Sequence, residues 1–294
     1  MATDVTLLGT GLLGAPMARR LLDTGLAVTV WNRTAAKAEA LGVHGAAVAG
    51  SPAEALEASP VSLLMLADAP AIRRTVFSPE AAARLGGRTL VQMGTIGPGE
   101  SVALAAEAAA SGAAWLEAPV LGSIPEALSG TLQVLAGGSE DDVERLTPLL
   151  SRLGTVRRVG AVGTAAALKL ALNQLIATLT AAFATSLAYV RAEGVPVETF
   201  LDVLRRSALH APTFDKKLPR MLAHDYTRPN FPVKHLLKDV SLFVAAAGAA
   251  GIDARLARAA GELAGKAIAM GLGETDYSAV ARAVEPATPG AGER

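Results

Sequence analysis

The chain opens with Val5-Thr-Leu-Leu-Gly9-Thr-Gly11-Leu-Leu-Gly14, an apolar run that ends in glycines spaced Gly-x-Gly-x-x-Gly. A helical pattern over residues 17–22 and a second apolar run over residues 28–31 follow it. This is the dinucleotide-binding fingerprint: the first glycine permits a tight turn, the second lets the backbone approach a pyrophosphate, and the third lets helix and strand pack closely. The pyrophosphate then lies at a helix N-terminus, whose free N–H groups and dipole favour negative charge. We therefore expect a dinucleotide to contact Gly9, Gly11, Leu12, Leu13 and Gly14.

The end of the second strand distinguishes NAD from NADP. An NAD site places a carboxylate there to bind the ribose 2′-hydroxyl, whereas an NADP site lacks the carboxylate and holds cations. This chain has Asn32-Arg33-Thr34, and Lys37 follows one helical turn later. A guanidinium can stack on adenine and bind the 2′-phosphate. We expect NADP(H) to contact Asn32, Arg33, Thr34 and Lys37. The alternative for Arg33 is a solvated charge at the start of a helix.

The composition limits the classes of protein to which the chain can belong. Its 294 residues, 51% hydrophobic and 18% charged, are typical of a soluble globular chain of two domains. A net charge of zero with no basic stripe argues against nucleic acid and anionic membranes as partners. The absence of cysteine excludes disulfides and thiolate chemistry, and it fits a cytoplasmic location. We expect no signal peptide, no membrane span and no metal.

Residues 1–161 alternate apolar β runs with helical stretches, which predicts an α/β fold with a doubly wound, largely parallel sheet. Ligands of such sheets lie beyond the carboxyl ends of the strands. We therefore expect Met65, Leu66 and Ala67 to contact the cofactor, and the loop 94–98 to line the same edge. The expected strands are Val5–Leu8, Val28–Trp31, Val61–Leu66, Thr89–Met93, Ala114–Leu116 and Leu132–Ala136.

Residues 162–294 are expected to form an all-helical second domain. The run from Thr164 to Glu193 contains no glycine or proline and few charges, and as one helix of about 30 residues it would extend roughly 45 Å. A helix so long and apolar should run through this domain and a subunit interface, so we expect a homo-oligomer. Residues 285–294 are expected to be a frayed tail. The further expected helices are Val197–Arg206, Thr213–Ala223, Pro232–Ala249, Ala254–Met270 and Tyr277–Val284.

Three segments contain side chains suited to chemistry. Lys169 and Asn173 stand four residues apart in the long apolar run, so both project from one helix face. Burial among apolar side chains lowers the pKa of a lysine towards the range useful for proton transfer. The turn at Gly122-Ser123 offers backbone N–H groups that can hold a carboxylate. In the segment 230–239, His235 and Asp239 are placed to pair. The alternatives are a lysine that reaches the surface, a plain connecting loop and a solvated helix face.

Together these segments resemble the β-hydroxyacid dehydrogenase family, most closely its glyoxylate/succinic semialdehyde reductase branch, with the 3-hydroxyisobutyrate dehydrogenases next. The resemblance spans nearly the whole chain and implies an NADP-binding Rossmann domain followed by an all-helical domain, in dimers or tetramers. It implies that Lys169 is the catalytic acid/base and that Asn173 binds substrate. It also implies cofactor contacts at Thr95 and Lys238. The implied substrate contacts are Leu121, Gly122, Ser123, Phe231 and Asp239.

Two departures from the family pattern stand out. The family turn usually reads Ala-Pro-Val-Ser-Gly, but Leu121 stands where that serine is expected. Loss of the hydroxyl removes one hydrogen bond to a substrate carboxylate, about 0.5–3 kcal/mol, and the isobutyl group makes the pocket drier. Ala165 replaces a usual glycine just before the catalytic helix. The first departure bears on the substrate, and neither bears on the hydride chemistry.

The resulting hypothesis is an NADPH-dependent oxidoreductase that reduces a small aldehyde or keto acid, with Lys169 as the general acid. One alternative is oxidation of a β-hydroxy acid, as in 3-hydroxyisobutyrate dehydrogenase. A second is imine reduction, which Leu121 favours and Lys169 disfavours. A third is a non-catalytic binding protein with a dehydrogenase-like body, which Lys169 also disfavours.

Overall fold

The computed structural model describes residues 3–285, and these residues form two compact units that divide between Leu170 and Ala171. The predicted division between residues 161 and 162 lies earlier, before the start of the long helix. The first turns of that helix belong with the N-terminal unit because a buried carboxylate of the sheet binds them. The predicted tail, residues 285–294, lies outside the described residues except for Glu285.

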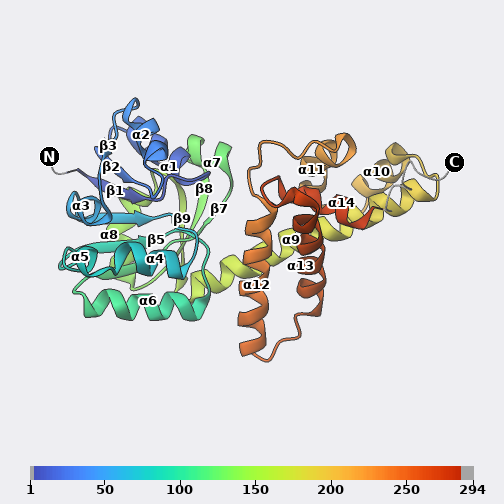
Figure 1. Cartoon of the computed structure of the whole chain (residues 1–294). Coiled ribbons are helices and arrows are strands. Elements are labelled where there is room, and N and C mark those ends of the chain that lie inside the picture. The colour runs from blue at the N-terminus through green and yellow to red at the C-terminus, as the bar shows by residue number, and fades with distance from the viewer. Residues whose placement is uncertain (1–2, 286–294) are drawn as a thin grey trace. The chain divides into compact units, whose positions relative to one another are not determined.

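A nine-stranded sheet forms the centre of the N-terminal unit (Figure 1). The strand order is β3-β2-β1-β4-β5-β6-β8-β7, with β9 paired to β8. The strands from β3 to β6 in this order pair in parallel, whereas β8 runs antiparallel to β6 and β7. The predicted α/β class with a largely parallel sheet is confirmed. The strands are β1 (Val5–Leu8), β2 (Val28–Trp31), β3 (Ala47–Val48), β4 (Val61–Leu64), β5 (Thr89–Gln92), β6 (Ala114–Glu117), β7 (Val120–Leu121), β8 (Leu132–Gly137) and β9 (Gly154–Gly160).

Strands β3, β7 and β9 were not predicted. Strands β3 and β7 contain two residues each, too few for an alternating pattern to be visible. Strand β9 contains Arg157 and Arg158, both exposed, so its sequence resembles that of a loop. These three strands acquire their conformation from pairing with neighbours rather than from their own apolar content.

Helices cover both faces of the sheet, each face with its own apolar core (Figure 1). Leu7 of β1 belongs to one core and Leu8 to the other, because successive side chains of a strand point to opposite faces of the sheet. The helices on the first face are α1 (Gly14–Asp23), α2 (Ala35–Gly42), α7 (Ile124–Ser129) and α8 (Glu140–Leu150). Those on the second face are α3 (Pro52–Glu57), α4 (Ala69–Val76), α5 (Pro79–Ala82) and α6 (Pro98–Ala110).

The C-terminal unit is entirely helical in the part that the structure describes, as predicted. Helix α9 (Thr164–Ala192) runs without interruption because it contains no glycine or proline, and Gly194, with φ of 71°, follows its end. The remaining elements are α10 (Val197–Arg205), α11 (Pro212–Ala223), α12 (Val233–Ala249), α13 (Arg255–Ala267), the π-helical turn η1 (Ile268–Leu272), the 3₁₀ turn η2 (Tyr277–Val280) and α14 (Ala281–Val284).

Helix α9 is long and apolar enough to cross a bilayer, by length and composition alone. Within its most apolar stretch, 44% of the residues are buried inside the chain. Ala177 and Ala181 belong to the core shared with α12 and α13, and Phe183 and Leu187 belong to the core shared with α10 and α11. The core helix of a globular unit passes the same test of length and hydropathy.

Candidate functional site

The three glycines of the dinucleotide fingerprint differ in the space around them. Gly9 has φ of 102°, and a Cβ atom on it would lie 2.3 Å from the carbonyl oxygen of Met65. A Cβ atom on Gly14 would lie 1.9 Å from the carbonyl oxygen of Gly9. A Cβ atom on Gly11, in contrast, would meet nothing within 4 Å. Gly9 and Gly14 are therefore required by the fold, whereas Gly11 leaves open space over the backbone, as a ligand that approaches closely would need.

Within the described part of the chain, no side chain caps the N-terminus of α1. Its N-cap residue, Leu13, makes no side-chain cap, and the first turn contains no acidic residue. Leu12, in the preceding loop, is exposed. The helix dipole and the first N–H groups therefore favour an external anion at this position.

The segment after β2 contains one structural residue and two cations. The amide oxygen of Asn32 accepts from the Thr10 backbone N–H at 3.1 Å, and its amide nitrogen donates to the carbonyl oxygen of Thr34 at 3.0 Å. Asn32 thus ties this segment to the glycine loop. Arg33 and Lys37 are exposed, and within residues 3–285 neither forms a hydrogen bond or an ion pair. Both remain available to an anionic ligand.

The loops after β4 and β5 lie against the glycine loop at the carboxyl edge of the sheet. The Met65 carbonyl faces Gly9, and a Cβ atom on Gly94 would lie 2.5 Å from the carbonyl oxygen of Leu66. The side chain of Gln92 accepts from the Gly94 N–H at 2.6 Å and donates to its carbonyl at 3.2 Å, which fixes the backbone just before Thr95. Ala67 is exposed and Thr95 is half-buried. The structure thus brings these predicted cofactor residues to one edge.

In the turn after β7, the donors of Ser123 are bound by a side chain for which the sequence predicted no role. Both the backbone N–H and the hydroxyl of Ser123 donate to Oε2 of Glu126, each at 2.7 Å. The resemblance had implied that this turn binds a substrate carboxylate. The signal was present in the sequence, because Ser123-Ile-Pro-Glu126 has the Ser-x-x-Glu spacing of a capping box at the start of α7.

Glu117, at the end of β6, fixes the first turn of α9. Its side chain is 1% exposed; one carboxylate oxygen accepts from the Ser101 hydroxyl at 2.6 Å, and the other accepts from the Ala165 N–H at 2.7 Å. Lys169 lies one helical turn after Ala165 and is 8% exposed. Sequence reasoning gave Glu117 no role, although a charged residue that ends a buried apolar strand is itself a signal. Ala165, where the family usually has glycine, still presents its N–H to this carboxylate.

In the C-terminal unit, three predicted residues form one cluster, in which Asn173 and Asp239 are buried and Lys238 is half-buried. The amide nitrogen of Asn173 donates to Oδ2 of Asp239 at 2.6 Å, and Nζ of Lys238 lies 2.9 Å from Oδ1 of the same carboxylate. Asn173 is 3% and Asp239 2% exposed. The amide oxygen of Asn173 has no hydrogen-bond partner among the described residues. An acceptor buried without a partner is costly, so this oxygen points to a group supplied by a ligand.

Phe231 lies at the edge of a second cluster. Its ring stacks on that of His235 at a centroid distance of 6.4 Å and meets the Tyr277 ring edge-on at 5.7 Å. Burial, together with nearby Lys238 and Lys234, lowers the pKa of His235. The imidazole is therefore neutral near pH 7. In place of the predicted pair with His235, the Asp239 carboxylate pairs with Lys238 and Asn173.

A buried ion pair supports this aromatic cluster. Nζ of Lys217 donates to both carboxylate oxygens of Asp276 at 2.8 Å and lies 4.1 Å from the centroid of the Tyr277 ring. Burial lowers the pKa of Lys217, although the hydrogen bond to Asp276 opposes that shift. Nothing in the sequence pattern identified this pair, because the two residues are far apart in the chain.

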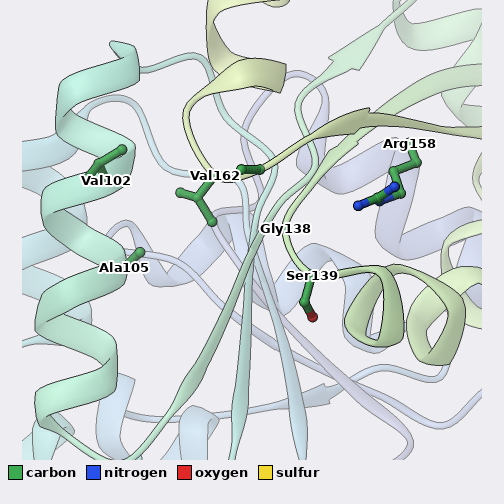
Figure 2. Close-up of a pocket in the computed structure, with 7 residues that line it drawn as sticks. Val102, Ala105, Gly138, Ser139, Arg158 and Val162 are labelled. Carbon is green, nitrogen blue, oxygen red and sulfur yellow. The ribbon is translucent and has the colours of Figure 1, made fainter.

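A pocket of about 520 Å³ lies elsewhere in the N-terminal unit, between α6, the start of α8 and the loop before α9 (Figure 2). Its lining contains none of the predicted site residues: it consists of Val102, Ala105, Gly138, Ser139, Arg158, Ala161 and Val162. Across residues 3–285, no three His, Asp or Glu side chains gather as a metal ion would require.

Comparisons with known proteins agree with this geometry. Residues 4–163 match the NAD-binding domain of 6-phosphogluconate dehydrogenase, and residues 163–284 match the NAD-binding domain of NADP-dependent 3-hydroxyisobutyrate dehydrogenase. Glyoxylate/succinic semialdehyde reductase 1 of Arabidopsis thaliana is 34% identical to this chain, over 96% of this chain and 98% of the relative.

Two solved structures are similar across almost the whole chain. The 3-hydroxyisobutyrate dehydrogenase of Mycobacterium tuberculosis, with L-serine, has a TM-score of 0.87 at 26% identity, covering 97% of this chain and 100% of that one. The reductive aminase of Aspergillus terreus, in complex with NADPH and ethyl levulinate, has a TM-score of 0.66 at 28% identity, covering 95% and 98%. The chain therefore belongs to the β-hydroxyacid dehydrogenase family, and it is an NAD(P)-dependent oxidoreductase that acts on CH–OH or carbonyl groups.

Proposed function

We propose that this enzyme uses NADPH to reduce a small aldehyde or keto acid, with Lys169 as the general acid. The observation that carries the proposal is the position of Lys169. It is buried one turn into a helix whose start is bound by Glu117, at the end of a strand of the nucleotide-binding sheet. A buried lysine on a helix whose start is fixed in this way suits proton transfer to a developing alkoxide.

The proposed preference for NADPH over NADH rests on the segment after β2. No carboxylate stands there, and Arg33 and Lys37 are two exposed cations without partners among the described residues. The glycine loop and α1 would hold the pyrophosphate, and these cations would hold the 2′-phosphate. Met65, Leu66, Ala67, Thr95 and Lys238 complete the proposed cofactor contacts.

The bound cofactor supplies a hydride to the carbonyl carbon of the substrate. Lys169 holds a proton on Nζ and donates it to the carbonyl oxygen; in the reverse direction, the neutral amine accepts that proton. Asn173 is one helical turn further along α9, and Asp239 holds its amide nitrogen. The free amide oxygen of Asn173 can therefore accept a hydrogen bond from the substrate hydroxyl and orient it.

The test compares turnover with cofactor binding in Lys169→Ala. We expect kcat for NADPH oxidation to fall by about 10²–10⁴-fold, while the dissociation constant of NADPH stays close to that of the wild type. Lys216→Ala, an exposed lysine on α11, is the control and should keep wild-type kcat. Full turnover by Lys169→Ala would remove the proposed role of this lysine.

We further propose that the chain assembles as a homodimer or homotetramer in the cytoplasm, with neither nucleic acid nor membrane as a partner. Support comes from α9, where Leu175, Leu179 and Tyr189 are 47%, 37% and 64% exposed. Large apolar side chains in such a row favour burial against another chain. Light scattering on the purified protein tests the assembly, and a monomer at micromolar concentration would contradict it.

A further inference from the structure

We propose that Glu126 and Leu121 make the turn after β7 select carbonyl substrates whose group at this turn is uncharged. The inference rests on the proposed function, because it assumes that a carbonyl compound is reduced at Lys169. It concerns the substrate class alone and does not depend on which nicotinamide cofactor is used.

Both donors of Ser123 are already bound to a carboxylate of the protein. The N–H and hydroxyl of Ser123 both donate to the same oxygen of Glu126 at 2.7 Å. Glu126 is attached three residues away on the same turn of helix, so its effective concentration at these donors is high. A substrate carboxylate would have to displace it or share donors with a like charge, and both outcomes disfavour binding.

Leu121 stands where the family usually has serine, so the turn lacks that hydroxyl group. It is half-buried in β7 and pairs with Gln133 of β8. An isobutyl side chain offers no hydrogen bond to an acid and contributes an apolar surface instead. The two residues therefore act in the same direction: Glu126 occupies the donors of Ser123, and the Leu121 side chain provides none.

The backbone of the turn has little freedom to move away from Glu126. Gly122 has φ of 131°, and a Cβ atom on it would lie 2.7 Å from Cδ2 of Leu132 and 3.1 Å from Cβ of Glu126. The turn is thus closely packed on both sides. The Ser123 donors would therefore be freed by rotation of the Glu126 side chain and not by a shift of the turn.

The turn belongs to the same edge of the sheet as the nucleotide loop. Helix α7 packs against α1, and Ala127 lies in the same core as Met17 and Ala18. Glu117, which binds the first turn of the Lys169 helix, precedes β7 by only a few residues. A substrate that binds at this edge, beside the start of the Lys169 helix, is thus near the strand that leads into the turn.

The experiment measures kcat/KM for NADPH oxidation with succinic semialdehyde and with its methyl ester, which has the same carbon chain but no charge. For the wild type, we expect the ester to be preferred by about 10-fold or more. In Glu126→Gln, the amide oxygen still caps Ser123 without a charge, so the preference should shrink by about 10-fold. Leu121→Ser should raise activity on the acid several-fold.

The control is Asp142→Asn, because the Ser139 hydroxyl at the start of α8 likewise donates to an acid three residues later, at 2.6 Å. It should leave the acid-to-ester ratio unchanged. A wild type that prefers the acid, or a Glu126→Gln ratio equal to that of the wild type, would overturn the inference while leaving the proposed reductase activity in place. If NADPH binds but neither compound nor butanal is reduced, the proposed function fails, and the inference fails with it.

Discussion

Two loops at the same edge of the sheet lead from a strand into a helix, and they treat the helix N-terminus in opposite ways. The loop Gly9–Gly14 enters α1 with no side-chain cap and no acid in the first turn, and Gly11 faces open space. The turn Gly122–Ser123 enters α7, where Glu126 accepts from both donors of Ser123. One N-terminus is left for an anion from outside, and the other holds an anion of the protein.

The difference shows that a glycine turn before a helix does not by itself make an anion site. The residue at the third helical position determines whether the N-cap donors are free for an external anion, since a glutamate there reaches back to those donors. In α1 that position is Pro16, which has no charge and no hydrogen-bonding side chain. In α9, Glu117 from a neighbouring strand plays the part that Glu126 plays in α7.

The largest expected effect comes from Gly14→Ala. Its Cβ atom would lie 1.9 Å from a backbone oxygen, which no side-chain movement can relieve. We expect a loss of at least about 3 kcal/mol in the free energy of unfolding, measured by urea denaturation. A variant as stable as the wild type would mean that the loop can rearrange and is not built around this contact.

Gly11→Ala is the matched substitution in the same loop. Since nothing lies within 4 Å of its Cβ position, stability should change by less than about 1 kcal/mol. The added methyl group would occupy the space over the backbone that a pyrophosphate needs, so NADPH should bind about 100-fold more weakly. Calorimetric titration measures this, and unchanged affinity would show that the open loop is not the pyrophosphate site.

Glu117→Gln tests the helix N-terminus that is capped from another strand. The neutral amide cannot bind the Ala165 N–H and the Ser101 hydroxyl as strongly as the carboxylate does. The Lys169 helix should lose its fixed start, and kcat should fall about 10- to 100-fold with little change in KM for NADPH. A lower melting temperature with unchanged kcat would limit Glu117 to a stabilising role.

Arg33→Ala tests the cations that accompany the open loop. Loss of the guanidinium should weaken NADPH binding by about 10-fold and leave NADH binding unchanged. The measurement is the ratio of kcat/KM for the two cofactors, with Arg74, an exposed arginine on α4, replaced by alanine as the control. An equal loss for both cofactors would assign Arg33 to adenine stacking and not to the 2′-phosphate.

Pro16→Glu gives α1 a glutamate at its third helical position, as α7 has in Glu126. A glutamate at this position should cap the N-terminus of α1, keep the fold, and compete with the pyrophosphate, so that NADPH affinity falls about 5-fold. Pro16→Gln separates the charge from the change of backbone residue. Tighter NADPH binding in the glutamate variant would contradict the proposed competition.

The nucleotide-binding half of the molecule could be predicted from the sequence because its signals are local. Strands β1 and β2 have the predicted bounds, and the backbone path of the loop excludes a side chain at Gly9 and at Gly14. Family resemblance then selected Lys169, Asn173 and Asp239. In the structure, Asn173 and Asp239 are hydrogen-bonded to each other.

Only the tertiary structure determines which charged and polar side chains are bound to a partner within the chain. Glu117 and Ser101, Lys217 and Asp276, and Asn173 and Asp239 are pairs separated by 16, 59 and 66 residues, and no periodicity links residues so far apart. Even the short-range Ser123–Glu126 cap shows its meaning only in the fold, where it removes donors that the family pattern assigns to a substrate. Sequence determines which backbone conformations are possible, because that is a local steric question. Packing determines which donors and acceptors remain free, because a buried polar group can bind only the partners that the folded chain brings to it.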